Sequence, residues 1–407
     1  MKEKKVIFTI VAKNYMASAL TLKGSVLKLH SDVDFYIVLA DQWDDEEQKK
    51  RGGNNVLVAD ASVVPEILSM SFFYDVVEFS TSIKPFYFLY FMKVLDYDKV
   101  IYLDPDIWVL SSMDGLWNSL IEHEAVLTPH ITDINCVSGY HKESHILSRG
   151  VFNLGFLGMR KSTDTIQFLN WWAIQMRTEC IRSETLFVDQ KWADYIPIFV
   201  KDIKIERSKA YNISDWNYHE RELDIKESEY YVQELDGSWN RISFFHFSGI
   251  KQQSIKSYLK LQKAKISKTT AMALENLIKT YQKTLLNYEY NYWSTCKYCY
   301  NKFDNGNEIL LLYRRLARSV FMQYGLEFKD YFGTGEGSFF QELRKGNFHS
   351  GETMSIHERR NKGYARRILK KIIRGYIKCM GMNRYESLID TIHNNSDRDE
   401  QWRWIWR

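Results

Sequence analysis

Two carboxylates, Asp104 and Asp106, stand on either side of a proline in the run Tyr-Leu-Asp-Pro-Asp at residues 102–106. The apolar residues 100–103 are typical of a buried strand, so both carboxylates follow the carboxyl end of a strand, where open α/β sheets bind ligands. Carboxylates hold divalent cations, and a bound cation neutralises a diphosphate and acts as a Lewis acid. A solvated acidic turn explains the same pair equally well.

The elements that position this pair follow an alternating pattern. From residue 6 to about residue 250, short apolar runs alternate with helical patterns, which predicts an α/β fold with a mainly parallel sheet covered by helices on both faces. Pro85 suits the first turn of a helix, where its missing N–H has no partner to lose. The predicted strands are residues 5–12, 34–40, 99–103, 125–128, 151–159 and 242–247, and the predicted helices are residues 17–30, 83–95, 163–180 and 187–195.

The pattern changes after about residue 252 to long helical stretches rich in Lys, Arg and Tyr. We therefore predict two domains, residues 1–260 and a mainly helical, basic region at 261–407. Residues 364–380 form an amphipathic pattern with one basic face, and residues 401–407 carry three tryptophans. These segments suit either peripheral contact with an anionic membrane or packing within the C-terminal domain.

Composition limits the remaining choices. The chain has 407 residues, 45% of them hydrophobic, enough for a large core, and its net charge of +4 does not indicate a nucleic-acid partner. We expect no membrane-spanning helix, because no run of about 18 apolar residues occurs. Five irregularly spaced cysteines favour a reducing compartment, the cytoplasm. Cys296 and Cys299 have the spacing of half a zinc site, but without a second pair a structural role is favoured.

Further segments match one known group in order and spacing. Over residues 5 to about 252 the chain resembles the GT-A glycosyltransferases, particularly the family that includes glycogenin and bacterial lipopolysaccharide galactosyltransferases. With the Asp-Pro-Asp run, the matching segments are Ala12-Lys13-Asn14-Tyr15 after the first strand, Ser82-Ile83-Lys84-Pro85, Val151-Phe152-Asn153-Leu154-Gly155-Phe156, Asp189-Gln190 and Phe245-His246-Phe247-Ser248-Gly249.

The resemblance implies how a nucleotide-sugar donor, most simply a UDP-sugar, is bound. Ala12, Lys13, Asn14 and Tyr15 correspond to the nucleotide-binding loop. Two basic residues, Lys84 and Lys251, would face the diphosphate. Lys251 departs from the pattern, because Gln252 and not proline follows it. On residue type alone, Lys84 is equally a solvated lysine at the start of a helix.

The same resemblance implies a third metal ligand, His246, beside Asp104 and Asp106. Two carboxylates and one imidazole suit Mn²⁺, with Mg²⁺ as the alternative. His246 would coordinate as a neutral ring, so activity should fall as the ring is protonated in acid. Without this context, a histidine between aromatic residues of a strand is ordinarily a core residue.

Asn153 and Asp189 are the candidate catalytic residues by resemblance. Asn153 would contact the donor sugar, although the same side chain could cap a turn. Asp189 would lie near the anomeric carbon in a reaction that retains configuration, but a carboxylate at a helix start is also a routine stabiliser. The Asn-Leu-Gly sequence at residues 153–155 departs from the family pattern and leaves the sugar contacts open.

The resemblance also implies a glycan or lipid-linked glycan acceptor, in the synthesis of a bacterial capsule or O-antigen at the inner face of the cell membrane. Two dipeptides, Tyr211-Asn212 and Trp216-Asn217, are candidates for acceptor binding or for a well-packed loop. One rival is a non-catalytic nucleotide- or carbohydrate-binding protein on the same fold. Another is a nucleotidyltransferase, although residues 11–15 lack the glycine-rich phosphate loop expected of one.

Overall fold

The computed structural model describes residues 3–134, 141, 143–183, 185–249, 266–345 and 384. The chain divides into two compact units, residues 1–299 and 300–407. The domain boundary predicted near residue 260 lies outside the described residues. Lys251, the basic segment 364–380 and the tryptophan-rich segment 401–407 lie outside them too.

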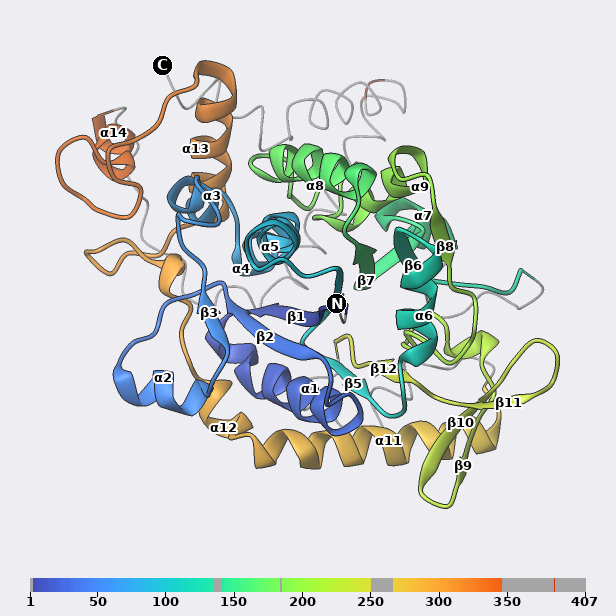
Figure 1. Ribbon diagram of the computed structural model, residues 1–407. Coiled ribbons are helices and arrows are strands. Elements are labelled where there is room, and N and C mark those ends of the chain that lie inside the picture. The colour runs from blue at the N-terminus through green and yellow to red at the C-terminus, as the bar shows by residue number, and fades with distance from the viewer. Residues whose placement is uncertain are drawn as a thin grey trace. The chain divides into compact units, whose positions relative to one another are not determined.

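The first unit is built on a seven-stranded sheet in the order β3-β2-β1-β4-β7-β6-β8 (Figure 1). Neighbouring strands are parallel except at β7, which is antiparallel to both β4 and β6. The strands are β1 (Lys5–Val11), β2 (Asp34–Leu39), β3 (Val56–Val58), β4 (Lys99–Leu103), β6 (Ala125–Pro129), β7 (Phe152–Arg160) and β8 (Ile203–Ile205). The predicted α/β fold is confirmed, and its first five predicted strands all belong to this sheet.

Helices cover both faces of the sheet, with α1 and α11 on one side and α5 and α8 on the other (Figure 1). Alternate side chains of β1 explain this arrangement: Ile7 packs in the core cluster with α1, whereas Phe8 lies 5.0 Å from the ring of Phe88 on α5. The helices are α1 (Met16–Leu29), α2 (Glu46–Gly52), α3 (Ile67–Phe73), α4 (Val76–Ser82), α5 (Lys84–Leu89) with its π-helical continuation η2 (Tyr90–Val94), α6 (Asp114–Glu122), α7 (Glu143–Arg149), α8 (Thr163–Met176), α9 (Ile196–Phe199), α11 (Lys268–Asn287) and α12 (Tyr290–Trp293).

One helix prediction is wrong in its start and type. The segment predicted as a helix over 187–195 is the 3-10 helix η3 (Gln190–Tyr195), which continues into α9. Phe187 forms an isolated bridge with Arg182, and Val188 has a positive φ of 45°. A β-branched residue in that region is uncommon, so this bend is imposed by tertiary packing and not by local preference.

Two smaller sheets complete the first unit. β5 (Ile107–Val109) pairs antiparallel with β12 (Phe244–His246), and β9 (Leu223–Lys226), β10 (Glu229–Gln233) and β11 (Trp239–Arg241) form a meander. The sixth predicted strand is therefore real but belongs to the β5–β12 sheet. That pairing joins the segment after the Asp-Pro-Asp run to a strand far along the chain.

The described part of the second unit, residues 300–345, contains α13 (Leu311–Tyr324) and α14 (Phe339–Lys345). Phe303, Phe328 and Phe339 are buried in it, and Phe328 meets Phe339 edge to face at 5.2 Å. The buried Arg314 donates a hydrogen bond to the carbonyl of Tyr300 at 2.6 Å. A small aromatic core therefore holds this unit together.

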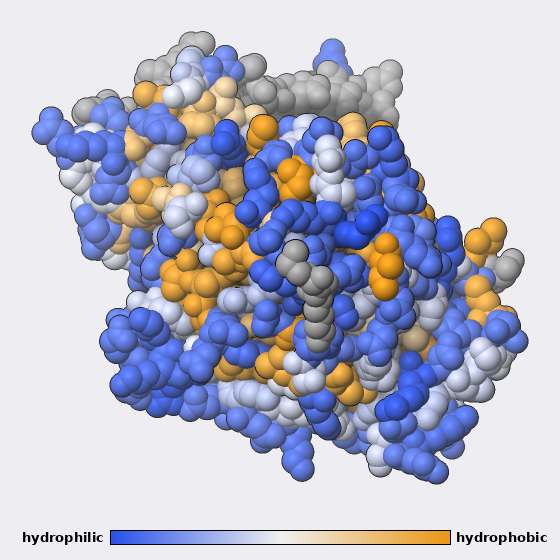
Figure 2. Space-filling view, in the orientation of Figure 1, coloured by the Kyte–Doolittle hydropathy of each residue, from blue (hydrophilic) through white to orange (hydrophobic). Residues whose placement is uncertain are grey.

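Hydrophilic residues predominate on the face of the molecule in Figure 2, with smaller hydrophobic groups between them. Within the described ranges, no helix combines the length and apolar character needed to span a bilayer. Cys296 and Cys299 are free thiols in the first unit. Cys296 Sγ lies 3.5 Å from the Gln48 amide nitrogen, which fits the structural role expected of it.

Candidate active site

The turn after β4 is held by the sheet on one side and by β12 on the other. The backbone N–H of Asp104 donates to the carbonyl of Gly155 on β7 at 2.7 Å. Beyond the turn, Ile107 pairs with His246 in the β5–β12 ladder, and the N–H of Phe247 donates to the carbonyl of Asp106 at 2.8 Å. Backbone hydrogen bonds therefore bring the histidine strand beside both carboxylates.

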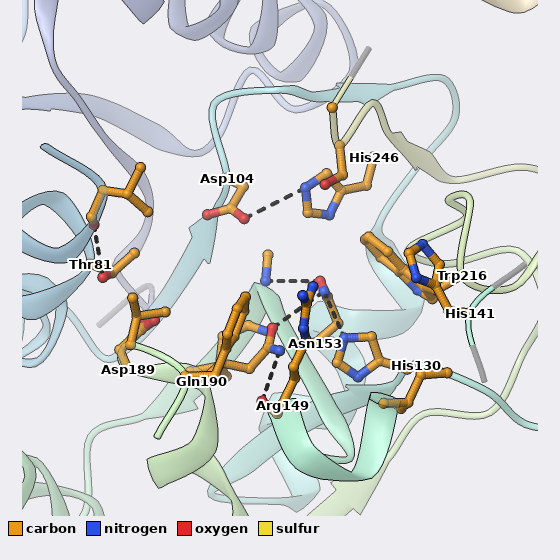
Figure 3. Close-up of a pocket in the computed structure, with 18 of the residues that line it drawn as sticks. Thr81, Asp104, His130, His141, Arg149, Asn153, Asp189, Gln190, Trp216 and His246 are labelled. Atoms are coloured by element: carbon orange, nitrogen blue, oxygen red, sulfur yellow. Dashed lines mark hydrogen bonds and ion pairs between the residues drawn. The ribbon is translucent and has the colours of Figure 1, made fainter. Parts of the chain in front are cut away.

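Asp104 and His246 face each other in Figure 3, and Asp106 completes the cluster. Their candidate ligand atoms all lie within 4.8 Å of one another. His246 Nε2 is 3.1 Å from Asp106 Oδ1 and 3.6 Å from Asp104 Oδ2. Two carboxylate oxygens and an imidazole nitrogen with room for further ligands fit Mn²⁺ or Mg²⁺.

The neighbours of His246 determine which ring nitrogen carries the proton. Nδ1 lies 3.2 Å from Asn212 Oδ1. The Asn212 amide nitrogen donates to Thr128 Oγ1 at 2.8 Å and to Asn153 Oδ1 at 3.0 Å, so its oxygen must face the histidine. His246 therefore carries a proton on Nδ1 and turns Nε2 toward the two carboxylates, the orientation typical of metal-ligating histidines.

Gly155 is required by the same packing. A Cβ at this position would lie 2.4 Å from His246 Cε1 and 2.7 Å from Asn153 Oδ1. Side chains do not approach that closely, so any other residue would displace the histidine ring. The glycine of the Asn-Leu-Gly sequence thus has a steric role that the sequence alone did not indicate.

Asn153 lies in the cavity wall, but its amide is engaged by neighbouring groups. Its oxygen accepts from Gly155 N and from the Asn212 amide, both at 3.0 Å. Its nitrogen lies 3.2 Å from His130 Nε2 and 3.4 Å from Gln190 Oε1. These bonds make Asn153 the centre of the network that orients His246, and its contact with a donor sugar stays a prediction.

Lys84 and Asp189 form a buried ion pair. Lys84 Nζ is 2.5 Å from Asp189 Oδ2, and both side chains are 3% exposed or less. Nζ also donates to the Leu154 carbonyl at 3.2 Å and lies 4.1 Å from the centre of the Tyr102 ring. The solvated-lysine interpretation is therefore wrong, and Asp189 makes no side-chain cap to its helix.

Lys84 opposes the effect of burial on the pKa of the Asp189 carboxyl. Burial raises the pKa of Asp189, and the Lys84 ammonium acts in the opposite direction. Burial likewise raises the pKa of Asp104, against Lys84 and His246. The hydroxyl of Tyr102 donates to Asp104 Oδ1 at 2.6 Å, so Tyr102 lies between the ion pair and the candidate metal centre.

The loop of Ala12, Lys13, Asn14 and Tyr15 follows β1 and forms the 3-10 helix η1 (Lys13–Tyr15). The Lys13 side chain is buried and pairs with Asp44, and its N–H donates to Asp41 Oδ2 at 3.2 Å. Asn14 and Tyr15 line a cavity of about 130 Å³ together with residues from α11 and α12. Burial, with a smaller contribution from Asp106, raises the pKa of Tyr15 to about 12.

A larger cavity of about 370 Å³ opens on the other side of the candidate metal centre (Figure 3). The two cavities share Asp106 and Gly249 in their walls, so they meet at the metal centre. The larger cavity is lined by Val77, Thr81, Lys84, Asp104, Asp106, His130, His141, His145, Ile146, Arg149, Asn153, Leu154, Gly155, Arg182, Phe187, Val188, Asp189, Gln190, Asp215, Trp216, His246, Ser248 and Gly249.

In the loop between β8 and β9, some side chains pack within the loop and others line the larger cavity. The Asn217 side chain accepts from Ser214 N at 2.9 Å and donates to the carbonyl of His130 at 3.2 Å, so it stabilises the loop. Trp216 lines the larger cavity, with its ring edge to face between His130 at 5.4 Å and His246 at 5.1 Å. The packed-loop interpretation fits both Asn212 and Asn217.

His130 is a part of the site that sequence analysis missed. It is 6% exposed, its Nδ1 lies 3.3 Å from the Val151 carbonyl, and burial lowers its pKa to about 4. One histidine after a strand has no distinguishing pattern in the sequence. Its contacts with Asn153 and with the Trp216 ring connect it to the candidate metal centre.

The comparisons with known proteins agree with this geometry. A model of glycosyl transferase family 8 matches residues 6–191, somewhat under half of the chain. The uncharacterised protein YfnD of Bacillus subtilis (strain 168) is 21% identical over 261 residues, which is 61% of this chain and 79% of the relative.

Two solved structures that the chain resembles are glycosyltransferases. One is the galactosyltransferase LgtC in complex with donor and acceptor sugar analogs, at 16% identity, 69% coverage of this chain, 95% of that chain and a TM-score of 0.40. The other is mouse xyloside xylosyltransferase 1, at 13% identity, with 60% and 98% coverage and a TM-score of 0.37.

The family match includes Asp104, Asp106, Asn153 and Asp189, and it falls on an α/β sheet whose strands lead to the candidate metal centre. The chain is a glycosyltransferase with the α/β fold that the sequence predicted. The family match confirms the predicted enzyme class and sets aside the nucleotidyltransferase and non-catalytic alternatives.

We predict that Mn²⁺ affinity falls with acid because of His246. Burial on its own lowers the pKa of this ring, but the carboxylates of Asp106 and Asp104 outweigh burial, so the pKa is raised. A protonated ring cannot coordinate, and below that raised pKa the apparent Mn²⁺ affinity of the wild type should fall about tenfold per pH unit. Calorimetric titration from pH 8 to pH 5.5 measures this, and His246→Asn should bind weakly with a shallower pH dependence. An equal slope in both proteins would refute the assignment.

His130 should make the folded state sensitive to acid. Its pKa is about 4 when folded and 6.5 in the unfolded reference, so it contributes stability that is present above pH 6.5 and lost as the pH falls toward 4. The difference corresponds to about 3 kcal/mol. Urea unfolding at several pH values should show that His130→Gln is less stable than the wild type at pH 7 but loses less on acidification. Parallel pH profiles of the two proteins would contradict the prediction.

Proposed function

We propose that this glycosyltransferase uses a nucleotide-diphosphate sugar, a UDP-sugar, together with Mn²⁺ or Mg²⁺, and transfers the sugar to a glycan or lipid-linked glycan. The observation that carries this proposal is the convergence of Asp104, Asp106 and His246 Nε2 at the junction of two cavities. A nucleotide-sugar donor has a nucleoside at one end and a sugar at the other. It therefore fits two adjoining cavities, with its diphosphate at their junction.

Each part of the donor has a matching part of the site. The nucleoside would occupy the smaller cavity, between Asn14 and Tyr15 on one side and Tyr281 on the other. The transferred sugar would occupy the larger cavity. Because the Lys13 side chain pairs with Asp44, the loop would act through Asn14, Tyr15 and its backbone at Ala12 and Lys13. Lys251 as a diphosphate contact remains a prediction.

Asp104, Asp106 and His246 would hold the cation, with the orientation of the His246 ring set by the contact of Nδ1 with Asn212. A divalent cation held there would neutralise the charge of the diphosphate leaving group. Asn153 would act by keeping Asn212 and Gly155 in place as well as by bordering the sugar. The site thus pairs a rigid histidine with two carboxylates from a tight turn.

Asp189 and Lys84 would form the wall beside the reacting carbon. Lys84 favours the ionised form of Asp189 despite burial, so a negative charge would face the positive charge that develops on the sugar. We propose transfer with retention, in which an oxygen of the leaving phosphate receives the proton of the acceptor hydroxyl on the same face. Bacterial surface polysaccharide synthesis in the cytoplasm, with membrane contact through residues 364–380, remains the predicted setting.

The first test of this function is metal-dependent hydrolysis of a panel of UDP-sugars in the absence of acceptor. Wild-type protein with Mn²⁺ should release UDP, and Asp104→Asn or Asp106→Asn should slow release at least about 100-fold because the cation loses an anionic ligand. Asp236→Asn, in the exposed turn between β10 and β11, is the matched control and should behave as wild type. The proposal fails if no UDP-sugar binds, or if either aspartate variant binds UDP and Mn²⁺ as wild type does.

A second test separates the structural and chemical roles of the ion pair. Asp189→Asn and Lys84→Met should each lower the free energy of unfolding by about 3 kcal/mol or more, because each leaves one buried charge without its partner. The double variant removes both charges and should regain much of that stability while staying inactive. Chemical unfolding and UDP release, measured on the same samples, distinguish the two roles. Wild-type turnover by the double variant would show that the pair only supports the fold.

A further inference from the structure

The charged side chains around the larger cavity are almost all matched. On the side of the metal centre, Asp104 and Asp106 face His246, and Lys84 pairs with Asp189. Once a divalent cation is bound, the charges of these groups balance one another, so none of them would attract a second charged ligand. An unmatched charge must therefore be sought on the opposite wall.

On the wall formed by α7 and the segment before η3, most charges are again paired. His141 Nε2 lies 3.2 Å from Asp215 Oδ2. The Arg182 guanidinium pairs with Asp75, the N-cap residue of α4. Among the charged residues that the structure describes in this wall, Arg149, the last residue of α7, is the exception.

Within the described ranges of the chain, no carboxylate oxygen lies within 4.0 Å of the Arg149 guanidinium, which instead sits 4.6 Å above the ring of Phe187. The side chain is half-buried and reaches into the cavity toward Asn153 (Figure 3). Burial lowers the pKa of Arg149, and Asp215 only opposes this effect. An arginine keeps its charge, so a partly buried guanidinium without a counterion costs free energy that an anionic ligand would recover.

The backbone that carries this arginine is held in place. The Gln190 side chain donates to the Arg149 carbonyl at 3.1 Å and accepts from Leu154 N at 3.3 Å. Gly150 follows with φ of +108°, and a Cβ there would lie 3.1 Å from the Gln190 carbonyl. The end of α7 is therefore tied to the strand of the candidate active site, which lowers the cost of ordering Arg149 on binding.

We propose that Arg149 recognises an anionic group, a carboxylate or a phosphate, on the substrate that fills the larger cavity. This inference rests on the proposed function. The donor diphosphate is not the group we assign to it, because Arg149 lines the larger cavity alone and not the junction with the nucleoside cavity. A planar guanidinium binds carboxylates and phosphates in a bidentate manner, so it would select acidic over neutral sugars. The anion belongs either to the transferred sugar or to the acceptor.

The test measures binding by calorimetry with Mn²⁺ present, in two arms. In the donor arm, UDP, UDP-glucose and UDP-glucuronate are titrated into wild type, Arg149→Gln and Arg149→Lys. In the acceptor arm, methyl glucoside, methyl glucuronide and glucose 6-phosphate are titrated into protein saturated with UDP. The matched control is Arg160→Gln, at the other end of β7 from Asn153.

Wild type should bind the acidic compound at least about tenfold more tightly than its neutral counterpart in one arm, the ratio expected of a charge-assisted hydrogen bond. Preference in the donor arm identifies an acidic transferred sugar, and preference in the acceptor arm identifies an acidic acceptor. Arg149→Gln should lose the preference, Arg149→Lys should keep part of it, and the control should keep all of it.

Absence of any preference in wild type overturns the inference without need of a variant. So does a preference that survives in Arg149→Gln, or a loss of UDP binding in that variant, which would place the arginine at the diphosphate. If wild type does not bind UDP with Mn²⁺ at all, the proposed function itself has failed. If UDP binding needs Asp104 and Asp106 but acidic and neutral sugars bind alike, only the Arg149 assignment has failed.

Discussion

The antiparallel pairing of Ile107 with His246 is the contact on which the site depends. It sets a strand near residue 245 directly beside the turn that carries Asp104 and Asp106, and two backbone hydrogen bonds hold that turn from opposite sides. A metal centre needs its ligands at the correct separation before the ion arrives, or their repulsion opposes assembly. The backbone hydrogen bonds hold the ligand residues at this separation without using their side chains.

A network of hydrogen bonds surrounds that pairing, and each polar side chain in it sets the orientation of the next. Asn212 has both amide hydrogens engaged, so its oxygen faces His246, and Asn153 and Gly155 keep Asn212 in place. Such networks are rigid because a buried polar group left without a partner costs about 1–3 kcal/mol. The consequence for function is that the fold itself sets the orientation of the His246 ring, with Nε2 toward Asp104 and Asp106.

Charge is distributed differently on the two sides of the larger cavity. Near the candidate metal centre, Lys84 and Asp189 form a buried ion pair, in which Lys84 opposes the rise in the Asp189 pKa that burial causes. On the far wall, Arg149 lies over the ring of Phe187 and pairs with no carboxylate of the described residues. In our proposal, the paired charges of Lys84 and Asp189 serve the transfer reaction, whereas the guanidinium of Arg149 selects the substrate.

The sequence by itself determined the α/β fold, because alternating apolar runs and helical patterns depend on local periodicity. It also determined the order along the chain of the segments that converge on the site. It could not determine the helix start at 190, where tertiary packing holds Val188 at a positive φ. Nor could it reveal His130 and Arg149, whose roles come from neighbours distant in the chain. Only the tertiary structure decided that Lys84 faces Asp189, that Lys13 pairs with Asp44, and which nitrogen of His246 faces the two carboxylates. The physical reason is that burial and pairing depend on three-dimensional contacts and not on the spacing of residues in the sequence.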